Sequence, residues 1–256
     1  YKTGEKTGTL VSSKSIPELD MFQTFQLSTD ETQLILGTEV ESIFRRSSQG
    51  IYYVYDLSSK SLSKIDEGKI QSPTFSPKGG KVAYVKNNNI YSYFISTGET
   101  TQITSDGKKN EVINGVTDWV YEEEFAFVRA FEWSPNGNQM AFLRFDESDV
   151  AEFSMDLYGT YGQSLYPSQD VFKYPKAGED NAKVSLHLFD FEENSTSKID
   201  LGEYEYLPRL KWTADENLFS VQSLNRYQNE LKVYLVDTKT DEAKLTLTEK
   251  DPAYVD

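Results

Sequence analysis

The amino-acid sequence predicts an all-β fold of about four four-stranded antiparallel blades that belong to a larger β-propeller. Three observations support this prediction. One hairpin pattern occurs four times along the chain, each copy is followed by a second hairpin, and the strand segments alternate apolar and polar residues. Aromatic residues make up 14% of the 256 residues, which favours strands because flat rings pack well on a pleated surface.

The first hairpin of each copy has a bulky apolar residue, a tight polar turn and then an apolar strand. Ser-Pro-Lys-Gly at 76–79 and Ser-Pro-Asn-Gly at 134–137 supply the turn chemistry. Proline presets φ for such a turn, and glycine tolerates a positive φ. The four copies lie at 26–36, 74–85, 132–143 and 211–221.

The second hairpin completes each blade. Its first strand is expected at 51–57, 89–94, 184–190 and 231–237, and short closing strands are expected near 64–65 and 101–103. Two hairpins give four antiparallel strands, which is the unit of a propeller blade.

The spacing of the copies predicts two insertions. The bulky residues Leu27, Phe75, Trp133 and Trp212 are separated by unequal intervals, whereas a plain blade needs roughly 40–50 residues. The long intervals place insertions around 110–128 and 145–180. Four blades close a ring only if the ring is small. The segment Tyr1–Asp20 hangs free of the repeat pattern, and the chain ends abruptly at Asp256. We therefore expect residues 1–256 to form one partial propeller domain.

Composition excludes several classes of protein and site. The net charge is −15, and an acidic surface repels nucleic acid and anionic lipid. The absence of cysteine excludes disulfides, thiolate metal sites and a cysteine nucleophile. No cluster has metal-ligand spacing and no glycine-rich phosphate loop occurs, so neither a metal nor a cofactor is expected. No stretch is long and apolar enough to span a bilayer.

The first insertion is acidic. Asn114-Gly115 predicts a turn, and Thr117 or Asp118 is expected to cap a short helix. Glutamates 122–124 then fall in its early turns. Such a run is usually a solvated face, but two of these carboxylates could instead hold a cation. A single ammonium has three donors and relieves the repulsion between two neighbouring carboxylates.

The sequence of this insertion resembles a known family. Asp-Trp-Val-Tyr-Glu-Glu-Glu at 118–124, followed by Trp-Ser-Pro-Asn-Gly at 133–137, is similar to the signature of the dipeptidyl peptidase IV family. Tyr-Pro-Lys-Ala-Gly-Glu-Asp-Asn at 174–181 matches again, and the similarity runs from about 20 to 240. The resemblance implies an eight-bladed propeller that caps an α/β-hydrolase domain of the same chain. It also implies release of N-terminal dipeptides with proline or alanine in second place.

The resemblance also implies roles for particular residues. Glu123 and Glu124 would grip the α-ammonium of the peptide substrate. A propeller arginine would contact the substrate carbonyl, and its place, just after Tyr55-Asp56-Leu57, is occupied by Lys60. Arg45 and Arg46 are the nearest alternatives in sequence.

The second insertion is rich in aromatic residues. Between 145 and 176 it contains seven Phe and Tyr residues among Gly, Ser and Asp. The segment could be a long hairpin arm whose rings cover the edge of a blade. Alternatively, a projecting arm with these rings could form a contact surface, because aromatic residues are enriched in interfaces. The family resemblance implies an arm through which a homodimer forms.

The sequence lacks the motifs of a catalytic serine. No Gly-x-Ser-x-Gly occurs, and the nearest match, Gly162-Gln163-Ser164-Leu165-Tyr166, lacks the second glycine. The single histidine, His187, falls in the middle of a predicted strand, where a packed residue is expected rather than a base. The catalytic serine, aspartate and histidine are therefore expected outside this chain, which alone should be inactive.

Two functions remain open at this stage. The first is the substrate-gating and amino-terminus-recognising propeller portion of a dipeptidyl-peptidase-IV-like serine peptidase. The alternative is a stand-alone propeller that binds protein or peptide without hydrolase activity. The gene sequence beyond Asp256 distinguishes them, since further blades and then Gly-x-Ser-x-Gly are expected only for the first. The lack of cysteine and the resemblance favour a periplasmic or secreted bacterial protein.

Overall fold

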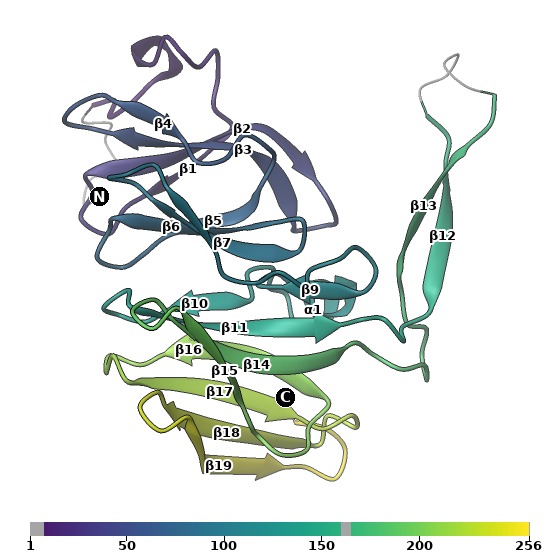
Figure 1. Ribbon diagram of the computed structural model, residues 1–256. Coiled ribbons are helices and arrows are strands. Elements are labelled where there is room, and N and C mark those ends of the chain that lie inside the picture. Colours follow the sequence, from purple (N-terminus) through teal and green to yellow (C-terminus); the bar gives the residue numbers. More distant parts are fainter. Residues whose placement is uncertain (1–7, 160–164, 256) are drawn as a thin grey trace.

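The computed structural model describes residues 8–159 and 165–255, which form four antiparallel blades (Figure 1). The sheets follow one another in a stack, with blades 1 and 4 at its opposite ends, so these four blades do not close a ring. The predicted fold class is therefore confirmed. The remaining residues lie outside the described part of the chain, and they include Gly162, Gln163 and Ser164 of the incomplete serine motif.

The strands follow the predicted order. Blade 1 consists of β1 (Thr24–Leu27), β2 (Gln33–Ser42), β3 (Ser48–Asp56) and β4 (Leu62–Lys64), and blade 2 of β5 (Gln71–Phe75), β6 (Lys81–Lys86), β7 (Asn89–Phe94) and β8 (Thr100–Gln102). Blade 3 consists of β10 (Phe131–Trp133), β11 (Gln139–Asp146), β14 (Lys183–Asp190) and β15 (Ser195–Ile199), and β9 (Val112–Asn114) also pairs with β11. Blade 4 consists of β16 (Tyr206–Trp212), β17 (Leu218–Leu224), β18 (Glu230–Asp237) and β19 (Glu242–Lys250).

The hairpin turns form for the reason that the sequence suggests. Gly79 and Gly137, which end the two Ser-Pro turns, have φ values of +74° each. Ser76 donates its hydroxyl hydrogen bond to the Gly79 carbonyl, and Ser134 donates to the Asn136 side chain. The four bulky residues found in the repeats are the last residues of β1, β5, β10 and β16. Each turn therefore follows the first strand of its blade.

The hydrophobic core lies between neighbouring sheets. Tyr52 of blade 1 packs with Tyr84 of blade 2, and Val85 of blade 2 packs with Phe131 of blade 3. Leu186 of blade 3 shares a third cluster with Phe219 of blade 4. Burying side chains of this size stabilises the fold by about 1.5–3 kcal/mol each. Each blade is thus held in place by its neighbours.

The order of strands places the loops on two opposite faces of the propeller. In blade 1, Thr24 at the start of β1 pairs with Gly37 of β2, so the β2–β3 loop at 43–47 lies on the face where the first strands begin. The turns that follow β1 and β3 lie on the other face. The insertion before β10 and the β2–β3 loop therefore share one face.

The segment before blade 1 does not hang free over its whole length, which corrects the expectation. It contains the 3₁₀ turn η1 (Ser13–Ser15), and Ile16 and Leu19 after it are buried against Leu34 and Leu36 of blade 1. The apolar pair Ile16 and Leu19 explains this contact, because burial removes both side chains from water.

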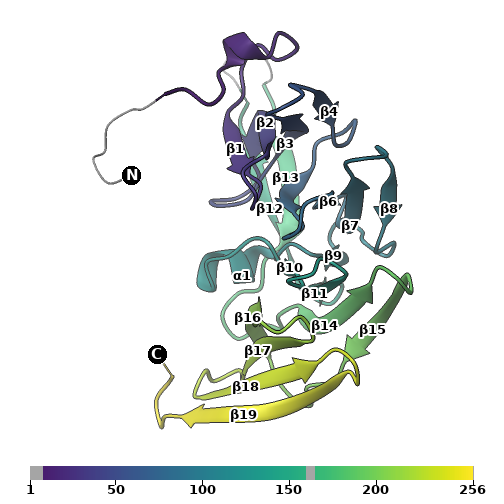
Figure 2. The same ribbon diagram turned by 90° about the vertical axis from the view of Figure 1, so that its left-hand side faces the viewer.

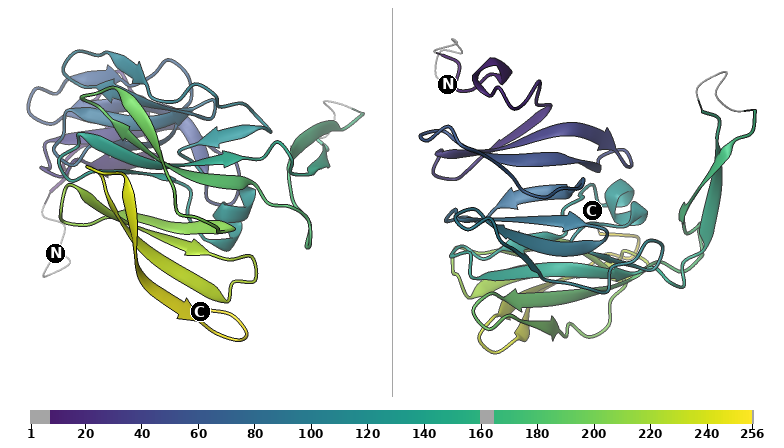
Figure 3. Two further views of the ribbon diagram at one scale, coloured as in Figure 1. Left: turned by 60° about the horizontal axis from the view of Figure 1, so that its bottom comes forward. Right: turned by 45° about the horizontal axis from the view of Figure 1, so that its top comes forward.

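The second insertion forms a hairpin arm. Strands β12 (Glu152–Leu157) and β13 (Ser168–Lys173) pair with each other and with no other strand of the described residues. The arm stands apart from the blades in both views of Figure 3. Among the described residues, no helix is long and apolar enough to cross a membrane.

Candidate functional site

The acidic insertion contains the short helix α1 (Trp119–Glu124), which Figure 2 shows on one side of the stacked sheets. Asp118 is its N-cap, with an extended backbone and a side chain that accepts a 2.9 Å hydrogen bond from the Tyr121 N–H. Thr117, the other predicted cap, instead donates its hydroxyl to the Phe127 carbonyl. Burial raises the pKa of the Asp118 carboxyl to about 6.

The inner side of α1 is tied to blade 4. The Tyr121 hydroxyl accepts a 2.8 Å hydrogen bond from the Leu207 N–H of β16, and the ring packs against Phe125 and Phe145. Arg209 of β16 donates to the Phe125 carbonyl at the end of the helix. These bonds hold α1 against β16, the first strand of blade 4.

Glu122 is not part of a solvated face. Its side chain is buried, and its Oε1 accepts hydrogen bonds from the backbone N–H groups of Arg46 at 2.5 Å and Ser47 at 2.9 Å. Both donors belong to the β2–β3 loop of blade 1. The resemblance assigned a role to Glu123 and Glu124 and none to Glu122, and the structure shows that Glu122 is buried and bonded to this loop.

Helical periodicity could have revealed this difference. Asp118, Tyr121, Glu122 and Phe125 follow the spacing i, i+3, i+4, i+7, which is typical of the inward face of a helix. The spacing places Glu122 beside Tyr121 and leaves the next two glutamates on the outward side.

Glu123 forms an ion pair with Arg45. The Arg45 Nε lies 3.0 Å from Glu123 Oε2, with the arginine side chain 74% exposed and the glutamate side chain 17% exposed. Arg45 lies in the β2–β3 loop, between blade 1 and the helix. The pair thus joins residues from two different blades on one face of the propeller.

Glu124 is exposed and has no hydrogen-bond or ion-pair partner within the described residues. It lies near Tyr206 of β16. Burial raises the pKa of the Tyr206 hydroxyl, and the charges of Glu205 and Glu124 act in the same direction. Glu124 is therefore an exposed carboxylate with free acceptor positions, and it follows Glu123 directly in α1.

Lys60 lies far from this site. It is in the turn between β3 and β4, and the loop with Arg45 lies at the other end of β3. The nine residues of β3 separate the two by about 30 Å at roughly 3.3 Å per residue. Of Lys60, Arg45 and Arg46, only Arg45 has its side chain paired with a glutamate of α1 in the described residues.

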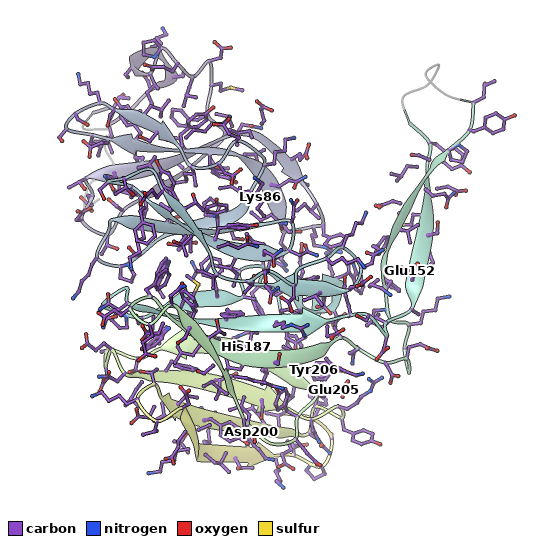
Figure 4. All side chains as sticks on the ribbon, in the orientation of Figure 1. Lys86, Glu152, His187, Asp200, Glu205 and Tyr206 are labelled. Atoms are coloured by element: carbon purple, nitrogen blue, oxygen red, sulfur yellow. The ribbon has the colours of Figure 1, made fainter. Side chains whose placement is uncertain are left out.

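A polar cluster borders the site on the side of blade 4. Asn181 donates to the Glu205 carboxylate at 2.8 Å and to the Tyr206 hydroxyl at 3.0 Å, and Arg226 pairs with the same carboxylate at 2.9 Å. Figure 4 labels Glu205 and Tyr206 side by side. Asn181 ends the second family-like segment, 174–181. Its contact with β16 was not predicted from the sequence, since that contact depends on how the blades stack.

His187 is a packed residue, as predicted. Its ring stacks on Phe142, with 5.2 Å between ring centroids, and its Nε2 lies 2.9 Å from the Ser185 hydroxyl (Figure 4). Burial lowers the pKa of His187 to about 4, and the positive charge of Arg144 acts in the same direction. The imidazole is therefore neutral at pH 7 and lies in the middle of a blade.

The match with a protein family begins directly after β1 and includes every later strand of the four blades. The family of the dipeptidyl peptidase IV (DPP IV) N-terminal region matches residues 28–256, a range that includes α1 and the arm. The chain belongs to the dipeptidyl peptidase IV family. The resemblance drawn from 118–124 is thereby confirmed, and it includes the N-terminal region of the family from the end of β1 onward.

Curated members of the family are similar along most of the chain. A probable dipeptidyl-aminopeptidase B of Aspergillus clavatus is 33% identical in an alignment 240 residues long, which covers 87% of this chain and 26% of the relative. Dipeptidyl aminopeptidase B of Saccharomyces cerevisiae is 32% identical in an alignment 222 residues long, which covers 84% of this chain and 27% of the relative. The chain thus spans about a quarter of the length of these relatives.

Solved structures of the family have the same fold. Dipeptidyl peptidase 4 of Porphyromonas gingivalis matches with a TM-score of 0.94 and 38% identity, over 100% of this chain and 37% of that one. A putative dipeptidyl aminopeptidase IV from Bacteroides ovatus matches with a TM-score of 0.67 at 23% identity, over 88% of this chain and 29% of that one. The second likeness concerns the fold alone.

Proposed function

We propose that this chain recognises the free amino terminus of peptides for a serine peptidase of the dipeptidyl peptidase IV type, and gates their access to it. Glu123 and Glu124 are the anchor for the substrate ammonium. The observation that carries the proposal is the 3.0 Å pair between Arg45 and Glu123, which lies beside the exposed Glu124 on one face of the propeller.

The charges at this site suit one ammonium group. Two carboxylates and one guanidinium leave a net charge of −1, which a single ammonium neutralises. The ammonium has three donors, so it can bond both carboxylates at once. Each charge-assisted hydrogen bond contributes about 1.5–3 kcal/mol net. An acetylated amino terminus carries no charge and only one N–H, and it gains little of this energy.

Arg45 is the proposed contact for the substrate carbonyl. A guanidinium has five N–H donors in a rigid fork, and the Nε atom faces Glu123. The side chain is 74% exposed, and its two Nη groups are the donors that we assign to the peptide. Arg45 thereby combines two tasks, because it orients Glu123 and offers donors to the peptide. Lys60 is not given this role, since its turn lies on the other face.

The catalytic step is assigned to residues outside this chain. The sequence contains no Gly-x-Ser-x-Gly, and the chain spans 26% of the A. clavatus relative. We assign the acyl transfer to a serine, aspartate and histidine of an α/β-hydrolase domain in the same protein. In this division of labour the propeller selects the substrate and the hydrolase cleaves it after the second residue.

Charge-neutral variants of the acids test the proposal. In the full-length protein, Glu123→Gln and Glu124→Gln should each lower kcat/KM for peptides with a free amino terminus by about 10- to 100-fold. Acetylated peptides should be affected little. Glu216→Gln is the matched control, because it removes one exposed negative charge from the opposite face of blade 4. Unchanged selectivity between free and acetylated peptides in both variants would sink this assignment. A protein that binds peptides without cleaving them would support the stand-alone binding module.

The arm is the proposed surface for a homodimer. Phe153, Met155 and Leu157 alternate along β12 and so lie on one face of the hairpin, where they are 38%, 45% and 45% exposed. Exposed apolar groups of this kind mark contact surfaces. Met155→Glu should shift the full-length protein from dimer to monomer in light scattering. Ser154→Glu, on the other face of β12, should not, and dissociation by both variants alike would argue against this surface.

The bacterial envelope is the proposed compartment, either periplasmic or secreted. The proposal rests on the absence of cysteine and on the family. Fractionation of the source cells tests it, and recovery of the full-length protein with cytosolic markers would rule it out.

A further inference from the structure

Glu122 makes a contact that the amine site itself does not explain. The side chain is 1% exposed, although a buried carboxylate is costly unless it is hydrogen-bonded. Its Oε1 accepts two backbone hydrogen bonds, from Arg46 N–H at 2.5 Å and from Ser47 N–H at 2.9 Å. A glutamate of the blade 3 insertion thus binds the main chain of blade 1, directly after Arg45.

The β2–β3 loop needs such support to place Arg45. The Arg45 side chain is 74% exposed, so packing does not fix its rotamer. A free arginine loses about 2 kcal/mol of rotamer entropy when it is held in one position. Within the loop, Ile43 N–H donates to the Ser47 carbonyl and Phe44 N–H to the Ser47 hydroxyl, so the loop closes on Ser47. Glu122 binds the loop at that closing residue and at Arg46.

We propose that Glu122 is a positioning residue for substrate recognition. By fixing the N–H groups of Arg46 and Ser47, it sets Arg45 beside Glu123 and so assembles the amine site from two blades. This inference rests on the proposed function of Glu123 and Glu124. It extends that function by assigning the first glutamate of the run a task that involves no contact with the peptide.

The chemistry of the contact defines the useful variants. Both hydrogen bonds end on one oxygen, so glutamine keeps the acceptor but loses the charge. Bonds to a charged acceptor are roughly twice as strong as neutral ones. Methionine has a similar length and volume and a very weak acceptor. Glu122→Met therefore removes the contact, and Glu122→Gln weakens it.

Kinetics of the full-length protein with a peptide substrate that has a free amino terminus test the proposal. Glu122→Met should lower kcat/KM about 10-fold or more, whereas Glu122→Gln, which keeps a weaker contact, should lower it only about 3-fold. The decisive measurement combines each variant with Arg45→Ala. If Glu122 acts through Arg45, the double variant should be within about 2-fold of Arg45→Ala alone, because contacts that act in series are not additive. Losses that multiply would overturn the proposal.

The same data separate this inference from the proposed function. If Glu123→Gln and Glu124→Gln leave selectivity for a free amino terminus unchanged, the amine site itself is wrong. If those variants lose selectivity, but the losses of kcat/KM caused by Glu122→Met and Arg45→Ala multiply in the double variant, only the positioning role is wrong. If Glu122→Met does not yield folded protein, Glu122→Gln is measured instead, both alone and combined with Arg45→Ala. It should lower kcat/KM about 3-fold on its own and cause no further loss when Arg45 is already alanine.

Discussion

The Nε atom of Arg45 in blade 1 lies 3.0 Å from the Oε2 atom of Glu123 in α1. This pair links a loop of the first blade to an insertion of the third, and it lies on the face where the first strand of each blade begins. Neither residue is close to the other in the sequence. The proposed recognition site therefore depends on how the blades stack and not on one sequence motif.

The first prediction concerns alanine substitution of Arg45 and of Lys60, the two basic candidates for the carbonyl contact. Arg45→Ala should lower kcat/KM of the full-length protein for dipeptide release about 10-fold, because Glu123 loses its partner and the substrate loses a positioned donor. Lys60→Ala should leave kcat/KM unchanged, since Lys60 lies at the opposite end of β3. A loss confined to Lys60→Ala would contradict the assignment of the two residues.

A second prediction concerns pH and Glu147, which lies at the base of the arm and is 6% exposed. Burial raises the pKa of Glu147 to about 7, the carboxylates of Asp118 and Asp146 act in the same direction, and the ammonium of Lys173 opposes them. A raised folded-state pKa means that the fold favours protonated Glu147. Its contribution to stability is full below pH 4.5 and is lost as the pH rises through about 7.

Glu147→Gln should remove this dependence, because the amide stays neutral. At pH 8 the variant should be more stable than the unmodified protein by up to about 3 kcal/mol, at about 1.4 kcal/mol per unit of pKa. Thermal unfolding from pH 4 to pH 8 measures the difference. Glu152→Gln, on the exposed arm, serves as control (Figure 4). Its stability should depend on pH in the same way as that of the unmodified protein. Parallel curves for Glu147→Gln and the unmodified protein would refute the prediction.

The hydroxyl of Tyr121 gives a third prediction. Tyr121→Phe removes the acceptor of the Leu207 N–H and leaves this buried donor unpaired, at a cost of about 1–3 kcal/mol. The thermal midpoint should fall by several degrees. Tyr234→Phe is the control, since Tyr234 is also buried but its hydroxyl has no hydrogen bond within the described residues. Equal midpoints for the two variants would show that the bond to β16 contributes little.

A fourth prediction compares two glycines with positive φ. Gly115 has a φ of +76°, and a Cβ there would lie 2.6 Å from Ile90 Cγ1. Gly178 has a φ of +89° with nothing within 4 Å. Gly115→Ala should therefore destabilise the protein clearly more than Gly178→Ala, whose cost is the left-handed backbone alone, about 1–2 kcal/mol. Urea midpoints rank the two variants, and the reverse order would count against the tight turn that leads into α1.

Local features of the structure could be read from the sequence. The Ser-Pro turns, the strand at 89–94 and the cap at Asp118 follow from turn chemistry and capping, which depend on neighbouring residues. The same holds for the hairpin arm between 145 and 176, where β12 and β13 form. Each of these elements depends on residues that are close to it in the sequence.

Relations between blades could not be read in this way. Alignment with the family placed Lys60 at the carbonyl contact, with Arg45 and Arg46 as alternatives. The two ends of β3 lie on opposite faces, and of the three residues only Arg45 pairs with a glutamate of α1 in the described residues. The different environments of Glu122 and Glu123 likewise depend on where the β2–β3 loop lies. Pairing of β9 with β11 was also not expected, since three residues carry too little pattern to predict a strand.

Helix α1 bridges blades that are not neighbours, with Glu122 bonded to blade 1 and Tyr121 to blade 4. Rotation of blade 1 relative to blade 4 would therefore move the helix relative to the guanidinium of Arg45. The proposed binding of the peptide amine should therefore depend on how all four blades stack. A mutation deep in a sheet that changes how two blades stack should weaken binding of the peptide amine from a distance, without altering any residue that the peptide touches.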